Sequence, residues 1–166
     1  MLPVSPDKMP GARKLNGVTE YEAALDELLA SAVHTLRIFD RTLSRRFNTP
    51  ERAALLGEFL RAKRTNRAMV VLHDASNTVR DCPRVIQLLR RFSHNLAIHQ
   101  TLQAARHVYD PFAVADDMRI VRRFHYNSVN GEAVTADVAM TGLLTKRFDE
   151  IWQASAPAVT ATTIGL

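Results

Sequence analysis

The stretch Tyr109-Asp110-Pro111-Phe112-Ala113-Val114-Ala115-Asp116 decides the expected fold. Its apolar centre is typical of a strand, and Asp116 followed by Asp117 predicts a tight turn where that strand ends. We therefore expect two strands joined by this turn, one over residues 107–115 and the other over 118–124.

Helices and strands alternate along the rest of the chain. Apolar residues at helical spacing predict helices, and short apolar or alternating runs predict strands. This alternation implies right-handed crossovers and a largely parallel sheet covered by helices. The predicted helices are 19–33, 50–60, 83–92 and 135–152, and the further predicted strands are 34–40, 69–72 and 95–101.

The expected fold class is α/β, a single domain over residues 18–154 with a mixed, largely parallel sheet flanked by helices. Its first helix is predicted to begin with a capping box, in which Thr19 is the N-cap and Glu22 reaches back to it. Prolines and glycines in residues 1–17 predict a flexible N-terminal arm, and small polar residues over 155–166 predict a flexible tail.

Composition excludes several classes of protein. The chain of 166 residues is 46% apolar and 23% charged, which is typical of a globular domain. Its one cysteine, Cys82, leaves no intramolecular disulfide, so a reducing cytoplasm is expected. We find neither a signal peptide nor an apolar run that spans a bilayer, and therefore expect no transmembrane segment.

The positive charge is carried mainly by arginine. The formal net charge is +5 at pH 7, and lysine occurs only at Lys8, Lys14, Lys63 and Lys146. A GC-rich genome explains this bias without any function. An anionic partner, such as nucleic acid, a phosphorylated ligand or a membrane surface, explains it equally well, because guanidinium binds phosphates and carboxylates in bidentate fashion.

The order of elements resembles one half of the phospholipase D superfamily. Residues 36–43 resemble its first strand and following loop, residues 69–74 its second strand, and the pair 107–115 and 118–124 its motif hairpin. Phe148-Asp-Glu-Ile-Trp152 resembles its closing helix. The resemblance spans residues 20–153 and points to an uncharacterised bacterial group of phospholipase D-like domains. Single-motif members of that superfamily pair as dimers, which implies a homodimer across the motif face, lined by Tyr109 and Phe112.

The motif that carries the superfamily's chemistry is degenerate in this chain. The superfamily has His-x-Lys, four residues and then Asp. Here Asp116 fits, but Tyr109 stands at the His position and Pro111 at the Lys position. The resemblance implies a histidine that attacks phosphorus and lysines that stabilise the transition state. A phenol titrates near pH 10 and proline carries no charge, so the sequence favours a domain without this activity, although it leaves catalysis open.

A shifted motif is an alternative, with His107 as nucleophile and arginines in place of lysine. Arg106, Arg119, Arg122 and Arg123 are the arginines available to bind a phosphate. Three of them lie with His125 near the fifth predicted strand, where arginine and aromatic residues together favour nucleic-acid binding. A charged edge strand explains the same residues.

His73 and Asp74 end a predicted buried strand, where α/β folds place ligand-binding groups, although a capping role suits Asp74 too. Neither metal-ligand spacing nor a glycine-rich phosphate loop is present, so we predict no metal and no cofactor. Three hypotheses follow: a non-catalytic domain that binds an anionic ligand or protein partner, a phosphodiesterase using His107, and a sequence-independent nucleic-acid binder. The ligand-binding candidates are Tyr109, Asp116, Arg106, Arg119, Arg122, Arg123, His125, His73 and Asp74.

Overall fold

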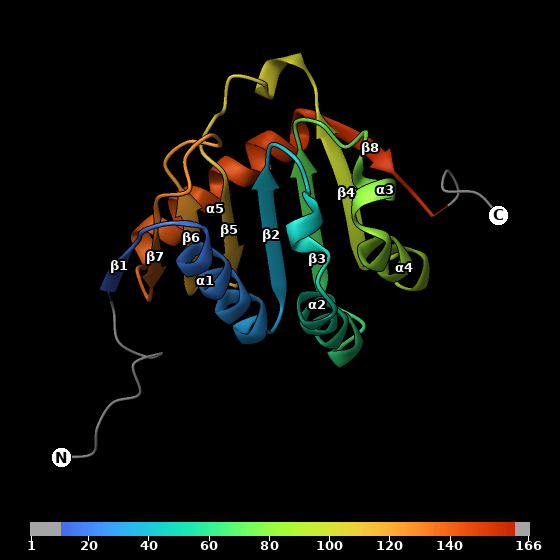
Figure 1. The fold of residues 1–166 in the computed structure, drawn as a ribbon, viewed down its shortest axis with the longest axis horizontal. Helices are drawn as coiled ribbons and strands as arrows, with labels where there is room; N and C mark the ends of the chain where they lie inside the picture. The colour runs from blue at the N-terminus through green and yellow to red at the C-terminus, as the bar shows by residue number, and fades with distance from the viewer. Residues whose placement is uncertain (1–10, 162–166) are drawn as a thin grey trace.

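One mixed sheet organises residues 11–161, the part of the chain that the computed structural model describes (Figure 1). Its strand order is β1-β7-β6-β5-β2-β3-β4-β8. The strands are β1 (Gly11–Leu15), β2 (Thr35–Asp40), β3 (Arg67–Leu72), β4 (Leu96–Thr101), β5 (Phe112–Ala115), β6 (Arg119–Arg123), β7 (Gly131–Thr135) and β8 (Ser155–Val159).

Helices cover both faces of this sheet. Figure 1 shows α1, α2 and α4 on the near face and α5 behind the strands. The helices are α1 (Val18–Ser31), α2 (Pro50–Ala62), the short α3 (Thr78–Asp81), α4 (Pro83–Arg91) and α5 (Val138–Gln153). The predicted fold, a single α/β domain with a mixed sheet flanked by helices, is confirmed.

Parallel pairing is restricted to the centre of the sheet. Within the described residues, β2 pairs with β3 and β3 with β4 in parallel, whereas every other neighbouring pair is antiparallel. The largely parallel sheet expected from the sequence is therefore only its central part. More of the strand pairs are antiparallel than the sequence predicts, because β1, β7 and β8 extend the sheet at its two sides.

The motif strand β5 is buried on both faces, which explains its unbroken apolar run. Ala113 and Ala115 pack in the cluster under α1, α2 and α4, whereas Phe112 and Val114 pack in the cluster under α5. Small side chains on one face leave room for α1 to lie close to β5. The alternation thus sets the strand between two hydrophobic layers.

The sequence gives little sign of β7, because its pairing depends on one close backbone contact. A Cβ atom on Gly131 would lie only 1.8 Å from the carbonyl oxygen of Arg122. Only glycine allows β7 to approach β6 at that point, and β7 in turn carries β1 along its other edge.

Three segments differ from the expectations. Gly11–Leu15, placed in the flexible arm, forms β1, and Ser155–Val159, placed in the flexible tail, forms β8. Each gains its order by pairing along the backbone with a strand distant in sequence, which local composition does not reveal. The predicted strand 107–115 shortens to β5, because residues 103–105 form a 3-10 turn and the chain enters the sheet only after Pro111. Residues 1–10 of the predicted arm and 162–166 of the predicted tail lie outside the described residues.

Helix starts are partly as predicted. Thr49 caps α2 by accepting a hydrogen bond from the Arg52 amide, as Pro50 at the first position indicates. The prediction of a capping box at α1 is wrong, because the helix starts after Gly17 without a side-chain cap. Glu22 instead forms an ion pair with Arg46, from the segment that follows β2.

Candidate functional site

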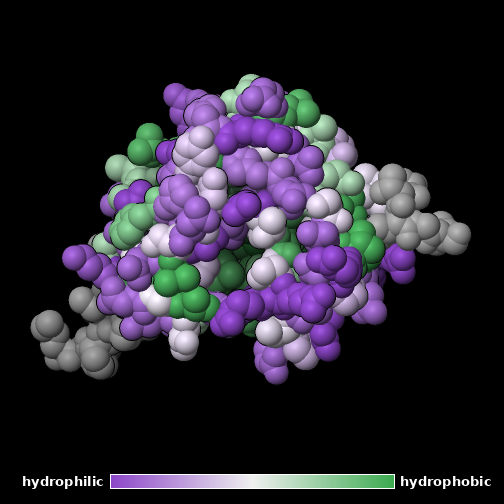
Figure 2. Space-filling model, turned by 45° about the horizontal axis from the view of Figure 1, so that its top comes forward, coloured by the Kyte–Doolittle hydropathy of each residue, from purple (hydrophilic) through white to green (hydrophobic). Residues whose placement is uncertain are grey.

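A cleft of about 550 Å³ opens at the carboxyl ends of β2 and β3. Figure 2 shows it as a hollow with apolar residues inside and mostly hydrophilic residues around it. Its walls come from α1, from the segment 41–47 after β2 and from the segment 123–129 after β6. The carboxyl edge of parallel strands is where open α/β sheets place their ligands.

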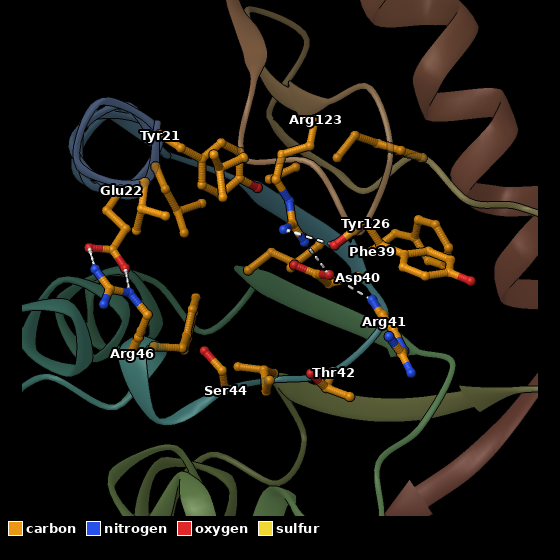
Figure 3. Close-up of a pocket in the computed structure, with 18 of the residues that line it drawn as sticks. Tyr21, Glu22, Phe39, Asp40, Arg41, Thr42, Ser44, Arg46, Arg123 and Tyr126 are labelled. Carbon is orange, nitrogen blue, oxygen red and sulfur yellow. Dashed lines mark hydrogen bonds and ion pairs between the residues drawn. The ribbon is translucent and has the colours of Figure 1, made fainter. Parts of the chain in front are cut away.

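An ion pair between Asp40 and Arg123 forms the back of the cleft (Figure 3). Asp40 is the last residue of β2, and Arg123 is the last residue of β6. Asp40 Oδ1 accepts hydrogen bonds from Arg123 Nη2 and from the Arg41 backbone amide, each 2.6 Å long. Both side chains are largely buried, so the low local dielectric strengthens the pair.

Burial also changes how the groups at the back of the cleft titrate. It raises the pKa of the Asp40 carboxyl above its ordinary value, and the attraction of Arg123 offsets only part of that rise. Burial likewise raises the pKa of the Tyr21 phenol, helped by the negative charge of Asp40. Tyr21 therefore stays protonated at neutral pH, with the Arg123 guanidinium 5.3 Å from its ring centroid.

Two further arginines that line the cleft are neutralised by carboxylates. Arg46 binds Glu22 through two hydrogen bonds of 2.6 and 3.2 Å. Arg52 is buried and binds Asp26 in the same bidentate way, at 2.6 and 3.1 Å. Such pairs fix the walls of the cleft and contribute little net charge to it.

Several other polar groups at the cleft make no hydrogen bond with a described residue. Arg41 lies over the Tyr126 ring at 5.1 Å, and within the described residues its guanidinium has no carboxylate partner. The hydroxyls of Thr42 and Ser44 and the second carboxylate oxygen of Asp40 likewise make no hydrogen bond with a described residue. Figure 3 shows Thr42 and Ser44 on the opposite side of the cleft from Asp40. Convergent polar groups of this kind are typical of a small-molecule site.

Tyr109 and Pro111, the residues at the expected histidine and lysine positions of the motif, lie at the same edge of the sheet as this cleft. Because β5 runs antiparallel to β2, its first residues reach the same edge of the sheet as Asp40. Tyr109 and His107 line a neighbouring hollow of about 420 Å³, together with His125 and Arg122. The Tyr109 ring stacks on His125, with 5.8 Å between centroids. The structure thus brings four sequence candidates together, and Arg123 lines both the hollow and the cleft.

Two of the four arginines that the sequence offers for phosphate binding form ion pairs within the molecule. Arg122 pairs with Glu132 on β7, its Nε 2.6 Å from the carboxylate, and Arg123 pairs with Asp40. Arg119 lies at the other end of β6, far along the strand from the cleft. Arg106 lines a separate shallow hollow beside β8. Of these four arginines, only Arg122 and Arg123 therefore share a site, the hollow beside the cleft.

His73 and Asp74 follow β3 but have different surroundings. His73 is held on both ring nitrogens: Nε2 lies 2.6 Å from the Val108 carbonyl oxygen and Nδ1 lies 2.7 Å from the Thr101 hydroxyl. It fixes the segment before β5 and does not line the cleft. Asp74 lines the cleft mouth, and hydrogen bonds from Ser76 lower the pKa of its carboxyl.

Asp116 lies at the opposite edge of the sheet from the cleft. Its carboxylate accepts hydrogen bonds from three consecutive backbone amides, at 3.0 Å from Val33, 2.7 Å from His34 and 3.0 Å from Thr35. Its own backbone has a φ of 53°, which aspartate tolerates better than most residues. The surviving motif aspartate thus anchors the start of β2.

Sequence reasoning missed Asp40, Tyr21 and Arg41 as site residues. The available signal was the end of the predicted strand 34–40, since the carboxyl end of a parallel strand is where ligands bind. Tyr21 carried no such signal, because its helical spacing is that of an ordinary core residue. In residues 11–161, no group of three or more His, Cys, Asp or Glu side chains is placed to hold a metal ion. No helix in that range has the length and apolar character needed to cross a membrane.

Solved structures with the same fold include members of the phospholipase D family. Nuc, a phospholipase D family member from Salmonella typhimurium, superposes with a TM-score of 0.66 at 11% identity, covering 92% of this chain and 100% of that one. NucT from Helicobacter pylori gives 0.63 at 14% identity, with 89% and 99% covered. At these identities the likeness shows the fold alone.

Two larger proteins contain the same fold. TrmBL2, an archaeal chromatin protein that binds DNA, gives a TM-score of 0.64 at 12% identity, with 89% of this chain and 54% of that one covered. Phosphatidylserine synthase from Haemophilus influenzae gives 0.60 at 14% identity, with 98% and 43% covered. This chain spans about half the length of each.

A search of curated protein sequences gave no match. A family model, described as a domain of unknown function (DUF7931), matches residues 18–162, which is most of the chain. The solved structures show that this chain has a phospholipase D-like sheet. Its cleft lies beside β5. The chain belongs to the DUF7931 family and has the fold of the phospholipase D family.

Proposed function

We propose that this protein is a non-catalytic, phospholipase D-like domain that binds a small anionic ligand in the cleft at the end of β2. One observation carries the proposal. Arg41, Thr42 and Ser44 lie around the cleft with side-chain donors that no described residue occupies. An arginine without a hydrogen-bonded carboxylate, beside two hydroxyls, suits a phosphate, sulfonate or carboxylate group.

The lost motif residues support a binding role without turnover. Tyr109 and Pro111 replace the side chains that would attack phosphorus and stabilise charge, and no histidine is among the described residues that line the cleft. Two histidines adjoin lining residues in sequence. His73 has both ring nitrogens engaged, and His125 lines the neighbouring hollow with its Nδ1 accepting a hydrogen bond from the Asn127 amide. The cleft therefore offers donors for an anion without a nucleophile aimed at it.

Titration with inorganic phosphate, followed by two-dimensional amide NMR, tests the proposal. We expect saturable shifts at Arg41, Thr42 and Ser44, which Arg41→Ala abolishes. Arg64→Ala serves as the matched control, because Arg64 is exposed and precedes β3 at the opposite edge of the sheet. Identical titrations of the two variants, or no saturation in the wild type, would reject the anion site.

A phosphodiesterase is the second candidate, since His107 and His125 share a hollow with Arg122 and Arg123. Its weakness is that both arginines are bound to carboxylates. Turnover of bis(p-nitrophenyl) phosphate that is lost in His107→Ala and retained in His94→Ala would establish this activity and overturn the non-catalytic assignment.

Nucleic-acid binding is the third candidate, because a DNA-binding chromatin protein shares the fold. Arg122 and Arg123, which the sequence offered for this role, form ion pairs within the molecule. We therefore expect no retardation of single- or double-stranded DNA at low salt, where non-specific binding is strongest. Retardation that weakens steeply with salt would favour this candidate over the anion cleft.

A further inference from the structure

The charges around the cleft are nearly balanced, which restricts the ligand that it fits. Among the described lining residues, four arginines face three carboxylates, and Asp26 neutralises Arg52 from just outside the lining. The arginines are Arg41, Arg46, Arg52 and Arg123, and the carboxylates are Glu22, Asp40 and Asp74. A polyphosphate would meet as much repulsion as attraction here. The balance suits a ligand with a single anionic group.

Asp40 offers a second point of recognition on the same ligand. Its Oδ1 is fully used by Arg123 and by the Arg41 amide. Its Oδ2 accepts no hydrogen bond from a described residue, although the carboxylate lines the cleft and is 24% exposed. A buried carboxylate gains from a donor on each oxygen, and this donor has to come from the ligand or from water.

The two recognition points are neighbours at the end of β2 (Figure 3). Arg41 follows Asp40 directly, and its guanidinium is held over Tyr126 on one side of the cleft. Thr42 and Ser44 lie opposite Asp40 (Figure 3). A short ligand can therefore reach the Arg41 side with one end and Asp40 with the other.

We propose that the cleft selects small molecules that have a single anionic group and also carry a hydroxyl or ammonium donor. The anionic group binds Arg41 with Thr42 and Ser44, and the donor binds Asp40 Oδ2. This inference rests on the proposed anion site, and it adds the feature that distinguishes the ligand from a simple anion. Specificity arises because a ligand without the donor displaces water from Oδ2 and leaves that oxygen without a hydrogen bond.

Three sulfonates of matched chain length test the inference. Propane-1-sulfonate ends in a methyl group, isethionate in a hydroxyl and taurine in an ammonium, and none is a phosphodiester that the enzyme alternative could cleave. We expect isethionate or taurine to bind about tenfold more tightly than propane-1-sulfonate, the effect of one hydrogen bond to a charged group. Comparing isethionate with taurine tells which donor is preferred.

Asp40→Asn provides the matched variant. The amide oxygen can still accept from Arg123 and from the Arg41 amide, but the amide nitrogen now presents a donor to the ligand. We expect the tenfold preference to vanish, and propane-1-sulfonate to bind more tightly than to the wild type, because the substitution removes a negative charge from the cleft. Asp117→Asn, which makes the same charge change at an exposed position away from the cleft, should keep the preference. Amide NMR of each variant checks that it is folded.

The outcomes separate this inference from the proposed function. Equal affinity for all three sulfonates would overturn the inference and leave the anion site standing. Failure of every sulfonate and of inorganic phosphate to bind would overturn the anion site itself. If Asp40→Asn does not fold, the ratio in the wild type still decides, because it needs no variant.

Discussion

At the scale of single residues, Asp116 has a structural role that is independent of any catalysis. Its carboxylate accepts hydrogen bonds from three backbone amides at the start of β2, and its own backbone is left-handed in the turn that joins β5 to β6. None of these contacts involves the side chains at positions 109 and 111.

Asp116→Ala is expected to lower the free energy of unfolding by about 2 kcal/mol, since it removes a charged acceptor from three amides. Urea unfolding followed by circular dichroism measures the change. Asp117→Ala is the control, because Asp117 is the exposed neighbour in the same turn. Equal losses in the two variants would contradict the anchoring role.

Asp40 predicts a pH dependence of stability. Its folded pKa lies above the ordinary value of 3.8, so the native state holds the proton more tightly than the unfolded chain does. Its contribution to stability is therefore fully present below that ordinary value and is lost as pH rises through the folded pKa. Asp40→Asn does not titrate, so it should become more stable relative to the wild type as pH rises from 4. Urea unfolding at several pH values measures the difference, and a constant difference would rule out the linkage.

At the scale of elements, the sequence predicts those whose signal is local. The cap and proline of α2, the apolar run of β3 and the alternation in β4 each depend on neighbouring residues, and each element forms near its expected position. β1, β7 and β8 depend on partners far along the chain, and their compositions resemble loops. Tertiary pairing overrides local preference there.

Gly131→Ala is expected to destabilise the protein by about 3 kcal/mol or more, because its Cβ would overlap the Arg122 carbonyl and force β7 away from β6. The matched control is Gly142→Ala, on an open face of α5, which should stabilise by about 0.5–1 kcal/mol through helix propensity. Thermal unfolding of both variants measures these opposite signs. A neutral Gly131→Ala would show that β7 tolerates a shifted register.

At the scale of the whole molecule, the candidate site was only partly predictable from sequence. Arg123 was identified as an arginine available to bind a phosphate and Asp74 from its position after a buried strand, and both line the cleft. Tyr21 and Arg46 could not be, because they reach the cleft only through the packing of α1 against the segment after β2. The residues of a site that is assembled from distant segments can be predicted only once the strand order is known.

The homodimer stays a prediction, and the structure changes its expected surface. Phe112 is 1% exposed and is unavailable, whereas Tyr109 and Phe124 are 49% and 56% exposed beside the same hollow. We expect sedimentation velocity to show a concentration-dependent dimer that Phe124→Ser weakens. Val79→Ser, an exposed apolar residue on α3, is the control. A strict monomer at high concentration would reject the dimer.

The single tryptophan gives the molecule a built-in optical label on one face only. Trp152 stacks on His99, 3.6 Å between ring centroids, behind the sheet with α5, and is not among the residues that line the cleft. The fluorescence emission of Trp152 should therefore report the packing of α5 and β8, and it should not change when a ligand binds in the cleft. Tyr21 and Tyr126, which do line the cleft, are the chromophores whose ultraviolet difference spectrum should respond when the cleft is filled.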